Sequence, residues 1–202
     1  MPISDDQKAA ICRITPTPHP GDRRGTGFLV DKRLVLTAFH VLEDAQTGKL
    51  HSGAFRFEFG LGIRNGKVFE TVSDGVVKSD PAQDWALLRC KKPPPIAALR
   101  IGPLRNSYLI RCDTFGFPDA AKEGGMAYSG TISALGAEIA MFVASALEQR
   151  ASKIEGLSGS PCIVNGVAVG IVVESESSDP LNQRSTQGGM MFATGDSHLE
   201  SS

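Results

Sequence analysis

The sequence predicts an all-β chain built in two halves, and three observations support this prediction. Glycine and proline, 22 and 12 of the 202 residues, exceed their average usage, which indicates many turns and short strands. Short apolar segments rich in β-branched residues recur between these turns, at the spacing typical of antiparallel barrels and sandwiches. A lysine- and proline-rich segment near the middle of the chain separates two halves of similar length.

Strand-like segments are assigned in chain order on both sides of that divide. In the first half they cover residues 9–14, 26–30, 34–37, 54–59, 68–72, 75–78 and 85–90. Residues 91–95, Lys-Lys-Pro-Pro-Pro, cannot continue a paired strand, because proline has no N–H to donate and consecutive prolines favour an extended polyproline conformation. In the second half the segments cover 108–113, 126–134, 139–144, 162–164, 167–173 and 190–193. We therefore expect one domain at 1–95 and a second at 96–202.

Charge and hydropathy exclude several classes of protein. Lysine and arginine (21) nearly cancel aspartate and glutamate (22), and no basic cluster dominates a segment, so we expect no nucleic-acid partner. No apolar run approaches the length of about 18 residues that a membrane span needs. The first residues lack the basic and apolar regions of a signal peptide. We expect a cytoplasmic protein without a membrane partner.

The cysteines indicate neither a metal site nor a disulfide framework. Cys12, Cys90, Cys112 and Cys162 lie far apart, with no Cys-x-x-Cys and no histidine at ligand spacing. We expect reduced thiols, no metal and no cofactor.

Three segments carry residues suited to nucleophilic catalysis, which needs a nucleophile, a base, a group that orients the base and donors for an oxyanion. His40 lies just past the end of the apolar strand 34–37. Asp84 opens another apolar strand, and a carboxylate beside a neutral imidazole fixes its tautomer. Ser158 lies in the hexapeptide 156–161, Gly-Leu-Ser-Gly-Ser-Pro, whose glycines permit a tight loop with converging backbone N–H groups.

Each candidate also has a simpler interpretation when it is taken alone. A histidine at a strand end is more often structural, an aspartate before a strand is often a turn residue, and a Gly-Ser loop need not be catalytic. Ser160 is a weaker nucleophile candidate than Ser158, because it precedes Pro161 and has no glycine two positions before it. An α/β-hydrolase is a poor fit, because its acid and histidine follow the nucleophile in the chain.

The three segments in the order His, Asp, Ser resemble the trypsin/chymotrypsin-like serine peptidases, and most of all the bacterial high-temperature-requirement (Deg-type) branch. Together the matching pieces are specific, although each one alone is weak. Besides the three segments they comprise residues 25–30, 115–118, 128–132, 170–171 and 191–193.

The resemblance implies a chymotrypsin-like double barrel, two six-stranded antiparallel β-barrels with the active site between them. It further implies a serine endopeptidase that forms an acyl-enzyme on Ser158, with His40 as general base and then acid and Asp84 orienting His40. The backbone N–H groups of Gly156 and Ser158 would form the oxyanion hole. The segment Val173, Glu174 and Ser175 would bind the substrate as an added strand.

Two departures from the family pattern concern activation and the orientation of the histidine. Leu157 stands where the secreted digestive members have an aspartate that receives the new N-terminal ammonium, so the Ser158 loop is either formed intrinsically or set by a partner. Val173 stands where many relatives have a serine or threonine that bonds the catalytic aspartate, so Asp84 needs a different donor.

The alternative function is a catalytically silent peptidase fold that binds a peptide or partner protein.

A peptidase that is not exported cannot be left to cleave proteins indiscriminately. We therefore expect narrow or regulated specificity toward protein or peptide substrates. Such regulation could come from further domains or from partner proteins.

Overall fold

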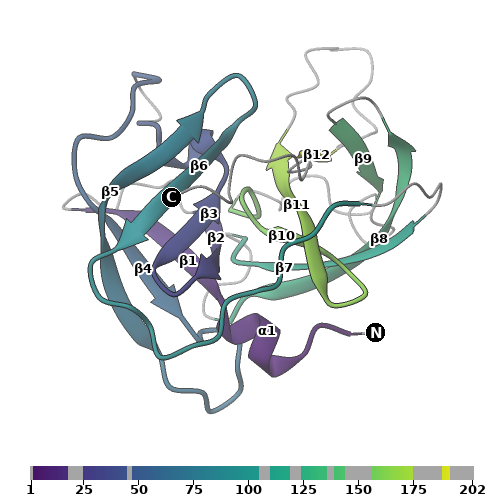
Figure 1. The fold of residues 1–202 in the computed structure, drawn as a ribbon, viewed down its shortest axis with the longest axis horizontal. Coiled ribbons are helices and arrows are strands. Elements are labelled where there is room, and N and C mark those ends of the chain that lie inside the picture. Colours follow the sequence, from purple (N-terminus) through teal and green to yellow (C-terminus); the bar gives the residue numbers. More distant parts are fainter. Residues whose placement is uncertain are drawn as a thin grey trace.

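The computed structural model describes residues 2–17, 25–44, 47–104, 110–118, 124–135, 139–143, 156–174 and 188–191. The strands lie in two groups that occupy the two sides of the molecule, β1–β6 on the left of Figure 1 and β7–β12 on the right. Helical structure among the described residues is limited to α1, Asp5–Ala9, and the 3-10 helix η1, Phe39–Leu42. The prediction of an all-β fold is confirmed.

The first half of the chain forms a closed antiparallel barrel of six strands. Its neighbour order is β1-β2-β3-β6-β5-β4, and β4 pairs back onto β1 with Phe57 opposite Ile14. The strands are β1 Ile11–Pro16, β2 Gly25–Asp31, β3 Leu34–Thr37, β4 Phe55–Phe59, β5 Phe69–Asp80 and β6 Trp85–Cys90.

The second half holds the other sheet, in which the described strands have the order β10-β11-β12-β9-β8-β7 and β7 also pairs with β10. Asn165 and Gly166 have φ of 50° and 81° and form the tight hairpin turn between β10 and β11, as an Asn-Gly pair favours. The strands are β7 Ile110–Gly116, β8 Met126–Leu135, β9 Ile139–Val143, β10 Pro161–Val164, β11 Val167–Glu174 and β12 Gly188–Met191.

Two local predictions were wrong. The segments predicted at 68–72 and 75–78 are one strand, β5, whose register against β6 shifts between Ser73 and Val76. Gly75, with φ of 105°, lies inside that irregularity, so its turn-like character marks a bulge and not a strand end. The strand predicted from residue 9 begins at Ile11, because α1 precedes it and is stabilised by a capping box between Ser4 and Gln7.

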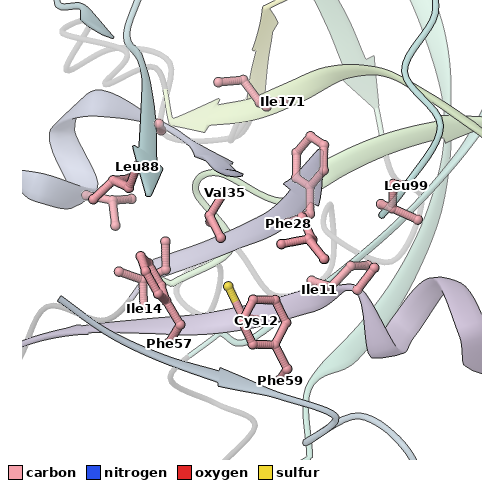
Figure 2. Packing of buried hydrophobic residues seen from close by; sticks show 14 of the residues in the cluster. Ile11, Cys12, Ile14, Phe28, Val35, Phe57, Phe59, Leu88, Leu99 and Ile171 are labelled. Carbon is pink, nitrogen blue, oxygen red and sulfur yellow. The ribbon is translucent and has the colours of Figure 1, made fainter. Parts of the chain in front are cut away.

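The core of the first barrel continues into the second sheet. Figure 2 shows Phe28, Phe57 and Phe59 in the barrel interior, and all three are almost completely buried. The same cluster includes Leu99 from the segment after β6 and Ile171 from β11. Because these side chains exclude water together, the two halves are packed on each other and present a fixed geometry where they meet.

The segment after β6 runs from the first barrel to the second sheet. Among its described residues, 91–104, there is no strand, in keeping with the proline-rich sequence. The N–H of Leu99 donates to the C=O of Leu29 in β2 at 2.8 Å, and the C=O of Arg100 accepts from the N–H of Ala168 in β11 at 2.8 Å. Neighbouring residues of this segment are therefore bonded to opposite halves.

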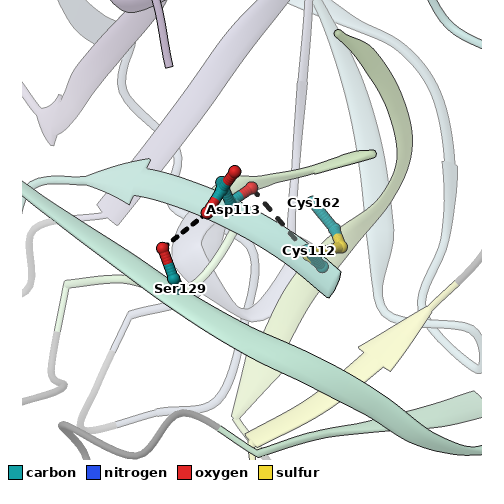
Figure 3. Close-up of a disulfide and its surroundings, with 4 residues drawn as sticks. All are labelled: Cys112, Asp113, Ser129 and Cys162. Atoms are coloured by element: carbon teal, nitrogen blue, oxygen red, sulfur yellow. Dashed lines mark hydrogen bonds between the residues drawn. A yellow bond between two sulfur atoms is a disulfide. The ribbon is translucent and has the colours of Figure 1, made fainter. Parts of the chain in front are cut away.

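The expectation of four reduced thiols was wrong for two of them. Cys112 and Cys162 form a disulfide between β7 and β10, with their Cα atoms 6.1 Å apart (Figure 3). Antiparallel pairing of these strands sets Cys162 opposite Thr114, two residues from Cys112, which brings the sulfur atoms within bonding distance. The sequence separation of 50 hid this proximity.

Cys12 and Cys90 are the free thiols of the described residues, and both are buried. Burial raises the pKa of Cys90 to about 11. Burial, reinforced by the neighbouring Cys90, raises the pKa of Cys12 well above the ordinary thiol range. Both side chains are therefore neutral core residues and poor nucleophiles at neutral pH.

Candidate active site

The imidazole of His40 is held by the carboxylate of Asp84. β3 and β6 are antiparallel neighbours with Thr37 opposite Ala86, so His40, just after β3, and Asp84, just before β6, meet although 44 positions separate them. Nδ1 of His40 lies 2.7 Å from Oδ2 of Asp84. The backbone N–H of His40 donates to Oδ1 of the same carboxylate at 2.9 Å.

This double contact determines the tautomer of His40. An ionised carboxylate only accepts hydrogen bonds, so the imidazole proton lies on Nδ1 and Nε2 is the acceptor nitrogen. The His40 and Asp84 side chains are 27% and 25% exposed, so the pair borders solvent and is accessible to a substrate. The arrangement suits a general base.

The backbone of Asp84 adds a third contact to the histidine segment. Asp84 has φ of 50°, in the left-handed region that aspartate tolerates better than most residues. This conformation turns its carbonyl toward Phe39, whose N–H donates to it at 3.1 Å. Asp84 thus accepts from the backbone N–H of His40, and Val173 is buried in the core.

Ser158 is the second residue of a tight turn, 157–160. The N–H of Ser160 donates to the C=O of Leu157 at 3.0 Å, and Gly159, the third residue, has φ of 84°, as a type II turn requires. Because a trans peptide sets C=O and N–H in opposite directions, the N–H of Ser158 points away from the Leu157 carbonyl and out of the turn.

The turn is seated on the first barrel directly beside the histidine segment. A Cβ on Gly159 would collide with the Thr26 carbonyl oxygen and the Thr37 hydroxyl, and would lie 3.0 Å from the backbone nitrogen of Ala38. The C=O of Ser158 accepts from the N–H of Thr26 at 2.9 Å. The turn that carries Ser158 therefore touches the residue two positions before His40, so the three predicted residues lie at one edge of the first barrel.

Gly156 and Leu157 fix the start of the turn that carries Ser158. Gly156 has φ of 91°, a conformation that other residues rarely adopt, and its C=O accepts from the Thr26 hydroxyl at 2.7 Å. Leu157 is 1% exposed and packs among residues of the second sheet, including Ile132 and Val172. Apolar burial thus holds the residue between Gly156 and Ser158 in place.

The N–H groups predicted to form an oxyanion hole are not used by the fold within the part of the chain that the structure describes. The recorded hydrogen bonds between described residues include no acceptor for the N–H of Gly156 or of Ser158. By contrast, the N–H of Gly159 donates to the C=O of Val172 at 2.7 Å and that of Ser160 to Leu157. The two N–H groups that the resemblance singled out thus differ from the next two in the turn, which are bonded within the fold.

The predicted substrate segment lies at the end of β11. Val173 and Glu174 pair with Gly189 and Gly188 of β12. Ser175 lies outside the described residues, as does the orientation of the Glu174 side chain. β11 is joined to the turn that carries Ser158 through Val172, whose N–H donates to the C=O of Ser160 at 2.8 Å.

Thr26 was not among the residues predicted for the site, although it bonds the C=O of Gly156, just before the turn, and the C=O of Ser158, within it. Its signal was present in the Gly-Thr-Gly of residues 25–27, which belongs to the matching segments. From the sequence alone, that motif indicates a strand of small residues. The hydrogen bond of the Thr26 hydroxyl to Gly156 is evident only in the folded structure.

The described residues contain no group of three or more potential metal ligands. Nor does any described helix have the length and hydropathy to span a membrane.

Comparison with known proteins agrees with this geometry. A family model described as the trypsin-like peptidase domain matches residues 25–171. None of the curated proteins matches the sequence significantly.

Three solved structures illustrate the similarity of fold. A Glu endopeptidase is 17% identical with a TM-score of 0.72, and the match covers 93% of this chain and 86% of that one. Deg5 is 18% identical with a TM-score of 0.65, covering 84% and 81%. An inactivated protease paralogue of the scabies mite is 12% identical with a TM-score of 0.70, covering 95% and 90%.

The family model spans well over half of the chain, in the region that contains His40, Asp84 and Ser158. The resemblance to trypsin-like peptidases is thereby confirmed. The chain belongs to the trypsin-like peptidase domain family and is a trypsin-like serine protease.

Proposed function

We propose that the protein is a serine endopeptidase in which Ser158 is the nucleophile, His40 is the general base and then the general acid, and Asp84 orients His40. The observation that carries this proposal is the 2.7 Å contact between His40 and Asp84 beside the seated turn of Ser158. Nδ1 is protonated by its contact with Asp84, which leaves Nε2 as the nitrogen able to take a proton from Ser158.

In the proposed reaction, Ser158 Oγ attacks the scissile carbonyl carbon while its proton moves to His40 Nε2. The C–N bond breaks as the leaving amine takes that proton, and an acyl-enzyme remains on Ser158. Water then attacks the ester carbon while one of its protons moves to His40 Nε2. The C–O bond to Ser158 breaks as Oγ takes that proton back, which releases the carboxylic acid and restores the serine. The positive charge that forms twice on the imidazole is stabilised by Asp84.

The proposed oxyanion hole is formed by the N–H groups of Gly156 and Ser158. Such donors act on charge that develops only in the transition state, and loss of one typically lowers kcat by about 10²–10³-fold. The positive φ of Gly156 and the turn around Gly159 support this assignment, since they direct these N–H groups away from internal acceptors.

We further propose that the active site lies between two barrels, 1–95 and 96–202, with Ser158 from the second and the other two residues from the first. A peptide would add as a strand beside Val173, Glu174 and Ser175, with its alternate side chains entering pockets of the second half. The closed pairing of β7 with β10 and the shared core support this arrangement.

The alternative, a silent binding module, has a precedent in fold, since the inactivated paralogue shares the architecture. The paired His40 and Asp84 count against it here, because a binding module needs no imidazole oriented by a carboxylate. We propose an enzyme of narrow specificity, in which other domains or proteins limit access to the site.

The test is incubation with a mixture of denatured proteins, followed by identification of the new N-termini by mass spectrometry. We expect cleavage at a restricted set of sequences by the wild type and none by Ser158→Ala. Peptide binding by both proteins without cleavage by either would support the silent module and end the enzyme proposal.

A further inference from the structure

Thr26 connects the turn 157–160, called the nucleophile turn below, to both halves of the molecule. It is fully buried on β2. Its N–H donates to the C=O of Ser158 at 2.9 Å and its hydroxyl to the C=O of Gly156 at 2.7 Å. Its hydroxyl oxygen accepts from the N–H of Phe117 at 3.0 Å, and its C=O accepts from the Thr37 hydroxyl at 2.7 Å.

The direction of each bond at the Thr26 hydroxyl is fixed by its partners. A backbone N–H only donates, so Phe117 supplies a proton to the oxygen. A carbonyl only accepts, so the single hydroxyl proton points at Gly156. Both bonds lie in a water-free interior, where a carbonyl or N–H left without a partner is costly. The hydroxyl therefore holds the Gly156 carbonyl in one orientation.

The two carbonyls that Thr26 holds belong to Gly156 and Ser158, the residues whose N–H groups form the proposed oxyanion hole. Between them, the side chain of Leu157 is buried in the second sheet. The peptide that carries the Ser158 N–H lies between these two bonded peptides, and its own C=O, that of Leu157, accepts from the N–H of Ser160. The three consecutive peptides from Gly156 to Gly159 are therefore all hydrogen-bonded, which leaves them little freedom to flip.

The end of β7 packs against Thr26 and the nucleophile turn. A Cβ on Gly116 would collide with the Ser160 hydroxyl and would lie 2.8 Å from both the Thr26 hydroxyl oxygen and Leu157 Cδ1. Because only a glycine fits there, Thr26 and the turn are packed tightly against the second half. Close packing of this kind transmits the position of β2 to the turn.

We propose that Thr26 is a positioning residue that holds the nucleophile turn in its catalytic conformation, in the role that an N-terminal ammonium has in the secreted relatives. The inference rests on the proposed function of Ser158 and deepens it. It accounts for the absence of an aspartate at Leu157, since a hydroxyl from the first barrel and burial of the leucine order the loop without zymogen cleavage.

The experiment compares Thr26→Val, which keeps the shape and removes the hydroxyl, with Thr26→Ser, which keeps the hydroxyl. Thr71→Val is the matched control. Thr71 lies in β5, away from the turn, and its buried hydroxyl also accepts from a backbone N–H, that of Lys92 at 3.1 Å. The probes are p-nitrophenyl acetate, for kcat and KM, and a fluorophosphonate, for the rate of covalent labelling. Thermal unfolding of each variant measures the folded fraction.

We expect Thr26→Val to lower kcat and the labelling rate by about 10- to 100-fold with KM within about twofold, because transition-state stabilisation is lost and ground-state binding is kept. Thr26→Ser should stay within about threefold of the wild type, and Thr71→Val should lower thermal stability with kcat unchanged.

A Thr26→Val enzyme with wild-type kcat would overturn the inference, as would a loss of activity that only tracks the folded fraction or that Thr26→Ser does not restore. A wild type inert toward both probes would instead overturn the proposed function, and this inference with it. The two failures are therefore distinguishable.

Discussion

Replacing Asp84 with asparagine removes one of the two oxygens that hold His40 while keeping the size of the side chain. In the wild type, Oδ1 accepts from the His40 N–H and Oδ2 faces Nδ1. An asparagine has one oxygen and one NH₂ for these two places. Asparagine also tolerates the left-handed backbone at this position, where φ is 50°, so the Phe39 contact is kept.

The geometry determines which way the amide turns. The His40 N–H has a fixed proton, so the asparagine oxygen must face it, and the NH₂ then donates to Nδ1. The imidazole proton is thereby moved to Nε2, the nitrogen that has to accept from Ser158. A base in the wrong tautomer loses its contribution to catalysis, and we expect kcat to fall by about 10⁴-fold, or roughly 5.4 kcal/mol of activation free energy.

The assay is steady-state hydrolysis of p-nitrophenyl acetate and of a peptide cleaved by the wild type, with thermal unfolding as the measure of folding. Asp80→Asn is the matched control, since the Asp80 carboxylate accepts from the turn N–H groups of Ala82 and Gln83 and an asparagine oxygen does the same. We expect that control to keep wild-type activity. An Asp84→Asn protein within threefold of wild-type kcat would refute the assigned tautomer and the role of Asp84.

Three further predictions concern the turn and the core. Gly159→Ala should destabilise the protein by at least about 1–2 kcal/mol in urea unfolding and lower labelling of Ser158, because alanine disfavours φ of 84° and meets the Thr26 carbonyl. Leu157→Ala should lower the free energy of unfolding by about 2–5 kcal/mol, because it leaves a cavity in the core. It should also slow fluorophosphonate labelling by more than the decrease in folded protein, measured by thermal unfolding, accounts for. Because burial raises the thiol pKa of Cys90 to about 11 and raises that of Cys12 well above its ordinary range, the folded state holds these protons more tightly than the unfolded state. Their contribution to unfolding free energy should be complete below the ordinary thiol pKa and disappear as the pH rises toward 11, and a pH-independent urea midpoint across that window would contradict it.

Local sequence signals predicted most of the strands and all three residues of the catalytic proposal. Alternating apolar segments and turn residues are short-range features, so β1–β4 and β6 appear close to their predicted places. The pairing of His40 with Asp84 came from the order of motifs along the chain, and antiparallel pairing of β3 with β6 supplies its physical cause.

The features that the sequence did not predict depend on contacts between distant segments. The disulfide of Cys112 and Cys162 requires the register of β7 against β10, which no single segment encodes. In the sequence Thr26 looks like one more β-branched strand residue, and only the fold places the turn 157–160 and Gly156 against it. The bulge at Gly75 was taken for a strand end, because a glycine marks both features equally well.

The most direct test of the account is a crystal structure of the protein after reaction with a fluorophosphonate. We predict phosphorus bonded to Ser158 Oγ, the phosphonyl oxygen about 2.7–3.1 Å from the nitrogens of Gly156 and Ser158, and His40 Nε2 within hydrogen-bond distance of the adduct. An adduct on another residue, or a phosphonyl oxygen turned away from both N–H groups, would contradict the account.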